Sequence, residues 1–176
     1  DAAGCGSVGG AAKQIMALDQ PPRRTIRVVL YGAEEVGLFG ADAYARRHSE
    51  SLTTHVLAAE SDFGAGSIWQ FQTNFGDAAL PYARAIQTLL TPIGVVPGNN
   101  EARGGPYVGV LRRSGVPVVT PAHNGLDYFD YHHTPDDTFD KIDPEEFQQN
   151  VAVYAAFTYM AAFTDWDFRK EPDMSV

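Results

Sequence analysis

Acidic and histidine side chains occur in three short segments of this chain, each placed where a strand is expected to end. Glu34 and Glu35 follow one apolar run, Glu60 and Asp62 follow a second, and the pair His132-His133 lies in the long loop after a third. Carboxylate and imidazole ligands without thiolates suit zinc, manganese or cobalt in a hydrolytic site. The residue types therefore indicate metal-dependent hydrolysis.

Each segment taken alone also has a structural explanation. Glu34 and Glu35 could favour the positive end of a following helix dipole, which is common for acids in a first helical turn. Glu60 or Asp62 could simply form a turn, and the histidine pair could be solvated or cap a helix. The three segments together are harder to explain in this way, because a soluble fold rarely collects so many ionisable groups at strand ends without a cation or a substrate.

Hydrophobic periodicity predicts the elements that must position these residues. β-branched runs predict strands over residues 25–31, 54–60, 68–73 and 116–120. Helical spacing predicts helices over residues 2–18, 36–49, 77–90 and 108–113, and residues 91–105 and 121–140 are expected to be irregular. Asp143-Pro144 begins a last helix as a cap followed by proline at the first position. Strands that alternate with helices predict an α/β sandwich with a mixed, largely parallel sheet, and parallel strands would bring the three segments to one sheet edge.

Length and composition limit the classes of protein to which the chain can belong. Its 176 residues, 44% of them hydrophobic and 20% charged, predict one globular domain over residues 1–176. A formal net charge of -9 argues against nucleic acid as a partner, because phosphate binding needs clustered Lys and Arg, and it suits a cation site. The single cysteine, Cys5, excludes an internal disulfide and a multi-cysteine zinc site. No apolar run reaches the ~20 residues of a membrane span.

Three motifs occur together in an order and spacing that resemble a known family. They are Tyr31-Gly-Ala-Glu-Glu-Val-Gly-Leu-Phe-Gly40, Glu60-Ser-Asp62 and Tyr128-Phe-Asp-Tyr-His-His-Thr-Pro-Asp-Asp-Thr138. With them the chain resembles the co-catalytic zinc exopeptidases of metallopeptidase family 28, most closely the carboxypeptidase Q subgroup and its bacterial relatives. The resemblance covers nearly the whole chain, since Asp143-Pro144 and the closing helix also fit. It implies a three-layer sandwich of the zinc-exopeptidase type.

The resemblance also implies a role for each matching residue. Glu34 matches the general base that takes a proton from a water shared by two zinc ions, and Glu35 matches a ligand of one zinc. Asp62 matches a ligand of the other zinc, and His133 matches a ligand of the same zinc as Glu35. His132 falls where relatives carry a residue that polarises the scissile carbonyl. Two neighbouring cations lower the pKa of a shared water, and a carboxylate beside them can carry its proton to the leaving amine.

The chain departs from the family pattern in two places. The family begins with a His-x-Asp motif and later has an Asp that bridges both metals, whereas Asp1-Ala-Ala-Gly4 matches only the part after that bridge. The resemblance thus implies that the N-terminal part of the domain is missing, so that one zinc keeps Glu35 and His133 and the other keeps Asp62 alone. Tyr107 stands where relatives commonly carry an Asp.

The residues and the resemblance lead to one functional expectation. We expect the C-terminal portion of the catalytic domain of a zinc aminopeptidase or dipeptidase-like exopeptidase, inactive by itself, whose parent cleaves a peptide or dipeptide near a free terminus. The family implies a secreted or periplasmic protein, and the residues leave the oligomeric state open. Asp136 or Asp137 is expected to orient His133 as a hydrogen-bond acceptor.

Two alternatives belong to other functional classes. A non-catalytic binding module of the same fold would be expected to lose ligands, and none of the four matched positions Glu34, Glu35, Asp62 and His133 is substituted. A phosphate- or nucleotide-binding domain would place a glycine-rich loop after a strand, and no strand precedes the glycines of residues 4–10.

Overall fold

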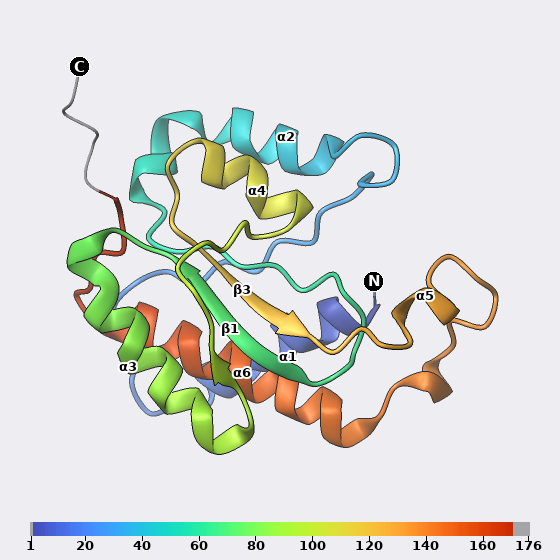
Figure 1. Ribbon diagram of the computed structural model, residues 1–176. Helices are drawn as coiled ribbons and strands as arrows, with labels where there is room; N and C mark the ends of the chain where they lie inside the picture. Colours follow the sequence, from blue (N-terminus) through green and yellow to red (C-terminus); the bar gives the residue numbers. More distant parts are fainter. Residues whose placement is uncertain (1, 171–176) are drawn as a thin grey trace.

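A three-stranded mixed sheet lies at the centre of the computed structural model, which describes residues 2–170 (Figure 1). Strand β1 (Ile68–Asn74) lies between β2 (Val96–Pro97) and β3 (Val118–His123). It runs parallel to β2, with Gln70 opposite Val96, and antiparallel to β3. The predicted α/β sandwich with a mixed sheet is confirmed.

Three helices cover one face of this sheet: α1 (Ala2–Met16), α3 (Leu80–Leu90) and α6 (Pro144–Phe163) (Figure 1). The small residues of α1 allow it to pack closely on α6. A Cβ atom on Gly6 would lie 2.9 Å from the ring of Phe147, so a larger residue there would force that ring to move. The helices bury the larger hydrophobic core against β1, and its fully buried members include Phe71, Phe75, Ile86, Leu90, Val153 and Phe168.

The start of α6 follows from its sequence. The side chain of Asp143 accepts hydrogen bonds from the backbone N–H groups of Glu145 and Glu146, at 2.8 and 3.1 Å. Pro144 occupies the first helical turn, where its missing N–H leaves no hydrogen bond unmade. The predicted cap is therefore confirmed.

Two shorter helices, α2 (Phe39–Arg47) and α4 (Pro106–Arg113), form the layer on the other face (Figure 1). They enclose the second hydrophobic core, whose buried members are Leu52, Ala102, Val108, Leu111, Val116 and Val118. Helix α2 begins three residues later than predicted, because Leu38 adopts a left-handed conformation with φ of 59° and residues 34–38 form a turn.

Two segments predicted as strands are not strands of the described sheet. Residues 25–31 make no backbone hydrogen bond with any described residue, and their predicted strand is wrong. Residues 49–54 form a 3₁₀ helix, and the run after it makes a single parallel bridge, from Ala58 to Val118. The physical reason is that β-branched sequence favours extended backbone, whereas a strand also needs a neighbour that completes its hydrogen bonds.

The remaining elements are short. Residues 91–105, expected to be irregular, contain β2 and the 3₁₀ turn η3 (Thr91–Ile93), and the long loop after β3 contains α5 (Tyr128–Tyr131) and η4 (Phe139–Lys141). Asp77 opens the 3₁₀ turn η2 (Asp77–Ala79) before α3 without capping it through its side chain. Among residues 2–170, no helix combines the length and the hydropathy that crossing a membrane requires.

Candidate active site

Glu34 and Glu35 lie in a tight turn between residues 25–31 and α2. The backbone oxygen of Glu34 accepts hydrogen bonds from the N–H groups of Gly37 and Leu38, at 2.9 and 3.0 Å. Because α2 begins only at Phe39, neither carboxylate belongs to its first helical turn. The helix-dipole explanation for the two acids is therefore wrong.

Glu35 and His133 are in direct contact although 98 residues separate them in the chain. Nε2 of His133 lies 2.8 Å from Oε1 of Glu35, and both side chains are more than half exposed. The backbone of His133 has a φ of 59°, an unusual conformation for a residue that is not glycine. Its ring stacks on that of His132, with centroids 3.8 Å apart. The structure thus brings a carboxylate and an imidazole from two of the three segments together.

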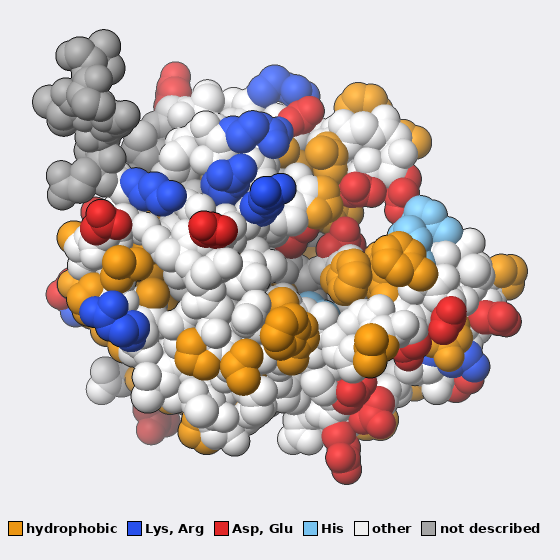
Figure 2. Space-filling view, in the orientation of Figure 1, with side chains coloured by type: hydrophobic (Ala, Val, Ile, Leu, Met, Phe, Trp, Pro, Cys, Tyr) orange, Lys and Arg blue, Asp and Glu red, His pale blue; other side chains and the backbone are white. Residues whose placement is uncertain are grey.

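Asp62 belongs to the remaining segment, and the charges of the other two segments act on its carboxyl group. Burial raises its pKa above the usual range, the charges of Glu34 and Glu35 raise it further, and His132 opposes the rise. Like charges so close to one another favour protonation unless a cation neutralises them. In Figure 2, histidine, acidic and hydrophobic side chains gather on the side of the molecule where α5 lies. The three segments therefore form one acidic cluster with histidine at its border.

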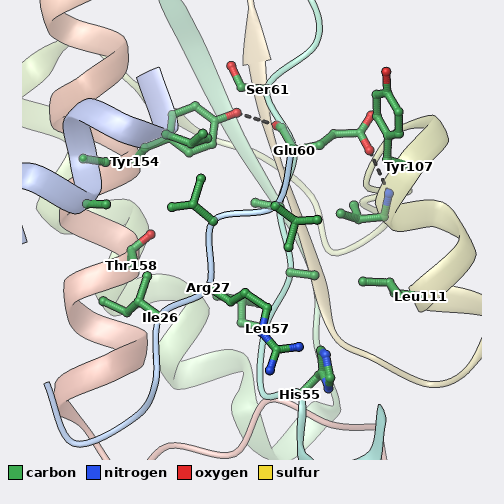
Figure 3. A pocket seen from close by; sticks show the side chains of 18 of the residues that line it. Ile26, Arg27, His55, Leu57, Glu60, Ser61, Tyr107, Leu111, Tyr154 and Thr158 are labelled. Atoms are coloured by element: carbon green, nitrogen blue, oxygen red, sulfur yellow. Dashed lines mark hydrogen bonds between the residues drawn. The ribbon is translucent and has the colours of Figure 1, made fainter. Parts of the chain in front are cut away.

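Glu60 belongs to the same cluster, and sequence analysis assigned it no role. Its Oε2 accepts a hydrogen bond from the backbone N–H of Val108 in the first turn of α4, at 2.8 Å (Figure 3). Burial raises the pKa of Glu60 to about 7, and the charges of Asp62 and Glu34 act in the same direction. In the sequence, Glu60 is recognisable only as an acid at the end of an apolar run. Its hydrogen bond to α4 could not be predicted, because the two residues are distant in sequence.

Tyr107 forms an aromatic wall beside the carboxylates. Its ring stacks on Tyr31, with centroids 5.2 Å apart and an angle of 11° between the planes. Burial raises the pKa of Tyr107 to about 12, and the charges of Asp62 and Glu34 contribute to the rise. The phenol therefore remains protonated at neutral pH and can donate a hydrogen bond toward the cluster.

The cluster supplies donors of the kinds that zinc prefers, but not a complete coordination sphere. Among residues 2–170, no group of three or more His, Cys, Asp or Glu side chains is arranged to hold a metal ion. Glu35 and His133 form a pair of one oxygen and one nitrogen donor, which fits two positions of a zinc site. Asp1, which follows the expected bridging position, lies outside the described residues.

The predicted orientation of His133 by an aspartate is not observed. Among the described residues, neither Asp136 nor Asp137 forms a hydrogen bond with its ring. The backbone of Asp136 instead bonds within the loop, to Thr134 and Thr138. The backbone N–H of Asp137 likewise bonds within the loop, to the oxygen of Thr134, at 3.2 Å.

The fold is a sandwich of helices around a mixed sheet, and carboxylate and histidine side chains gather where separate segments end. This arrangement defines an α/β protein with a candidate hydrolytic centre. Comparison with known families narrows this class. Residues 1–158 match Peptidase family M28, and the chain belongs to this family. It is similar to mouse carboxypeptidase Q, with 32% identity over 146 residues, and to the rat protein, with 30% identity over 141 residues. These matches cover 82% and 80% of the chain but only 30% of each relative.

Solved structures agree with this assignment. The crystal structure of a Peptidase M28 precursor from Shewanella amazonensis SB2B superposes with a TM-score of 0.94 and 51% identity, covering 98% of this chain and 39% of that one. The LapA aminopeptidase of Legionella pneumophila has a TM-score of 0.61 and 19% identity, over 94% of this chain and 47% of that one, which shows the shared fold alone. The chain therefore spans less than half the length of these relatives.

Proposed function

We propose that the chain is part of the catalytic domain of a zinc-dependent exopeptidase that hydrolyses a peptide bond near a free terminus. The observation that carries this proposal is the 2.8 Å contact between Glu35 and His133, which joins two distant motifs beside Glu34. Membership of Peptidase family M28 and the likeness to carboxypeptidase Q support a peptide or dipeptide as the substrate. The same likeness supports a secreted or periplasmic protein, which remains an expectation from relatives.

The side chains of the cluster divide the chemistry among them. Glu35 and His133 would hold one zinc ion and Asp62 would contribute to a second. Zinc, when bound, would supply Lewis-acid activation of water and of the scissile carbonyl. The carboxylate of Glu34 would accept a proton from the attacking water and deliver it to the leaving amine. His132 would donate a hydrogen bond to the carbonyl oxygen of the substrate.

The same proposal holds that this chain alone does not complete the site. Three candidate ligands for two ions fall short of the three protein ligands that a catalytic zinc ion usually has. The curated relatives are more than three times as long as the part that matches, so sequence outside these residues would supply the rest. The 176-residue chain would therefore bind zinc weakly and show no turnover by itself.

The decisive experiment compares this chain with the product of the gene's full open reading frame. Zinc per protein would be measured by elemental analysis, and hydrolysis would be measured with dipeptides and aminoacyl amides. Two zinc ions and activity in the long product, with neither in the 176-residue chain, would support the proposal. A long product that is folded but binds no zinc would overturn it.

A further inference from the structure

Four exposed arginines gather at one end of the layer formed by α2 and α4. Arg46 and Arg47 lie in the last turn of α2, and Arg112 and Arg113 lie in the last turn of α4. The residues directly before each pair pack in or against the second hydrophobic core, so the two turns are neighbours. Figure 2 shows Lys and Arg side chains gathered over this layer. The fold thus brings together two arginine pairs that are distant in the sequence, and we call these four residues the basic end.

The basic end has no ion pair among the described residues. The arginines that pair with acids or donate hydrogen bonds there are others, namely Arg23, Arg24, Arg27 and Arg169. Even Glu50, in the 3₁₀ helix after α2, forms no ion pair with the four guanidinium groups. A cation at a helix C-terminus favours the helix dipole, but four like charges in two neighbouring turns also repel one another. An anionic partner would remove this repulsion.

The same two helices have the acidic cluster at their opposite ends. Glu34 and Glu35 lie in the turn before α2, and Glu60 accepts a hydrogen bond from the first turn of α4. Helix α2 has nine residues and α4 has eight, so the two groups of charges are separated by roughly 12–14 Å along the helices. This separation exceeds the Debye length of about 8 Å at an ionic strength of about 0.15 M. A partner at the basic end would therefore experience little repulsion from the carboxylates of the acidic cluster.

We propose that the basic end docks on the phosphate headgroups of an anionic lipid bilayer. Guanidinium groups bind phosphate oxygens in a bidentate geometry, and each basic residue close to an anionic bilayer strengthens binding by about fivefold. Docking in this way would leave the candidate active site one helix length from the bilayer. The inference goes beyond the proposed function, since docking requires neither zinc nor a peptide.

The position of the basic end favours a bilayer over other anionic partners. The four side chains project from the exposed ends of two helices, and they line neither of the two main cavities of the described chain. They therefore suit a broad surface better than a small anion that needs a pocket. A flexible polyanion such as nucleic acid would also reach the acids of a chain whose formal net charge is -9. A planar bilayer meets only the face that approaches it.

The test uses the product of the full open reading frame and sedimentation with lipid vesicles. One set of vesicles contains phosphatidylcholine alone, and the other contains about one third phosphatidylglycerol. EDTA in the buffer prevents a metal ion from bridging protein and phosphate. At an ionic strength of about 0.1 M, the protein should bind the anionic vesicles at least about tenfold more strongly than the neutral ones. At about 1 M, where the Debye length is about 3 Å, this difference should disappear.

Matched double variants locate the binding on the protein. Arg112→Gln with Arg113→Gln removes two charges from the basic end and should weaken binding to anionic vesicles by about tenfold or more. Lys13→Gln with Arg84→Gln removes the same charge from exposed residues of α1 and α3, in the opposite layer, and should change binding by less than about twofold. Arg112→Lys with Arg113→Lys retains the charge and should retain most of the binding.

Circular dichroism shows whether each variant is folded. If the glutamine pair on α4 fails to fold, Arg46→Gln with Arg47→Gln on α2 makes the same test with the same expected loss. Equal binding to neutral and anionic vesicles, or an equal loss in the Lys13 and Arg84 control, would overturn the proposal. Tighter binding to a short DNA duplex than to anionic vesicles, at equal phosphate concentration, would also overturn it in favour of nucleic acid.

Discussion

The carboxylate of Glu60 accepts a hydrogen bond from the backbone N–H of Val108 at a distance of 2.8 Å. This bond fastens the end of residues 54–60 to the first turn of α4, and so fixes the position of Tyr107 beside the acidic cluster. The turn before α4 must approach the carboxylate closely, and Gly105 permits this approach. A Cβ atom at position 105 would lie 1.8 Å from Oε1 of Glu60.

We predict that Gly105→Ala destabilises the protein by about 2–6 kcal/mol. Gly105 has a φ of 92° and a ψ of -175°, a backbone region that is essentially restricted to glycine, so an alanine there is strained by about 1–3 kcal/mol, and the clash with Glu60 adds an overpacking term of about 1–3 kcal/mol. Gly94→Ala is the control for a positive φ without a clash, because Gly94 has a φ of 87°, a ψ of 8° and open space around it, and it should lose only about 1 kcal/mol. Urea unfolding measures the free energy of unfolding of both variants, and equal losses in the two would contradict the role of the contact with Glu60.

A second prediction concerns His123, which is buried on β3 with its Nε2 lacking a hydrogen-bond partner among the described residues. Burial lowers the pKa of this histidine below its usual 6.5, although the bond to the oxygen of Gly66 opposes the shift. The folded state therefore favours the neutral ring. The stability that this provides is present above pH 6.5 and is lost as the pH falls through the folded-state pKa, by at most about 1.4 kcal/mol per pH unit.

The His123→Asn variant keeps a donor for Gly66 but cannot titrate. Its unfolding free energy should fall less than that of the native protein between pH 7 and pH 5, while the carboxyl groups that titrate in both proteins cancel in the comparison. Chemical denaturation across this range measures the difference. Identical pH dependence in the two proteins would show that His123 titrates normally.

Elements with local sequence signals were predictable, whereas those that depend on a neighbour were not. Strands β1 and β3 and the cap at Asp143 follow from alternation and from capping chemistry, and the structure contains all three. Residues 25–31 carry an equally clear β pattern but have no strand beside them among residues 2–170, and a sequence pattern alone does not reveal whether such a neighbour is present. The two-residue strand β2 carries too short a pattern to be recognised.

The candidate site likewise has features that were predictable from the sequence and features that were not. The sequence motifs singled out Glu35 and His133 for one site, and the fold brings their side chains into contact, whereas their roles as zinc ligands stay a prediction. Partners set by loop geometry were not predictable: the backbone of Asp136 bonds within the loop, and among the described residues its side chain forms no hydrogen bond with His133. The contact of Glu60 with α4 depends on a glycine turn that no motif revealed.

Removal of metal should distinguish the complete protein from this chain. If sequence outside these residues completes the zinc site, EDTA should lower the melting temperature of the long product, because a ligand present at 100 times its Kd contributes about 2.7 kcal/mol to stability. The 176-residue chain should melt at the same temperature with and without EDTA. Differential scanning calorimetry with added zinc as a reversal control checks both, and an EDTA effect of equal size in the two would argue that this chain binds zinc by itself.

Replacement of Glu34 should remove catalytic turnover, whereas replacement of the neighbouring Glu35 should remove bound zinc. In the long product, Glu34→Gln should retain both zinc ions and lose about 10²–10⁴-fold in kcat, because only the proton-transfer group is removed. Glu35→Gln should lose zinc, since an amide is a weaker ligand than a carboxylate and the contact with His133 is also weakened. Zinc analysis and kcat on the same preparations separate the two roles, and equal zinc loss in both variants would show that the assignment of base and ligand is wrong.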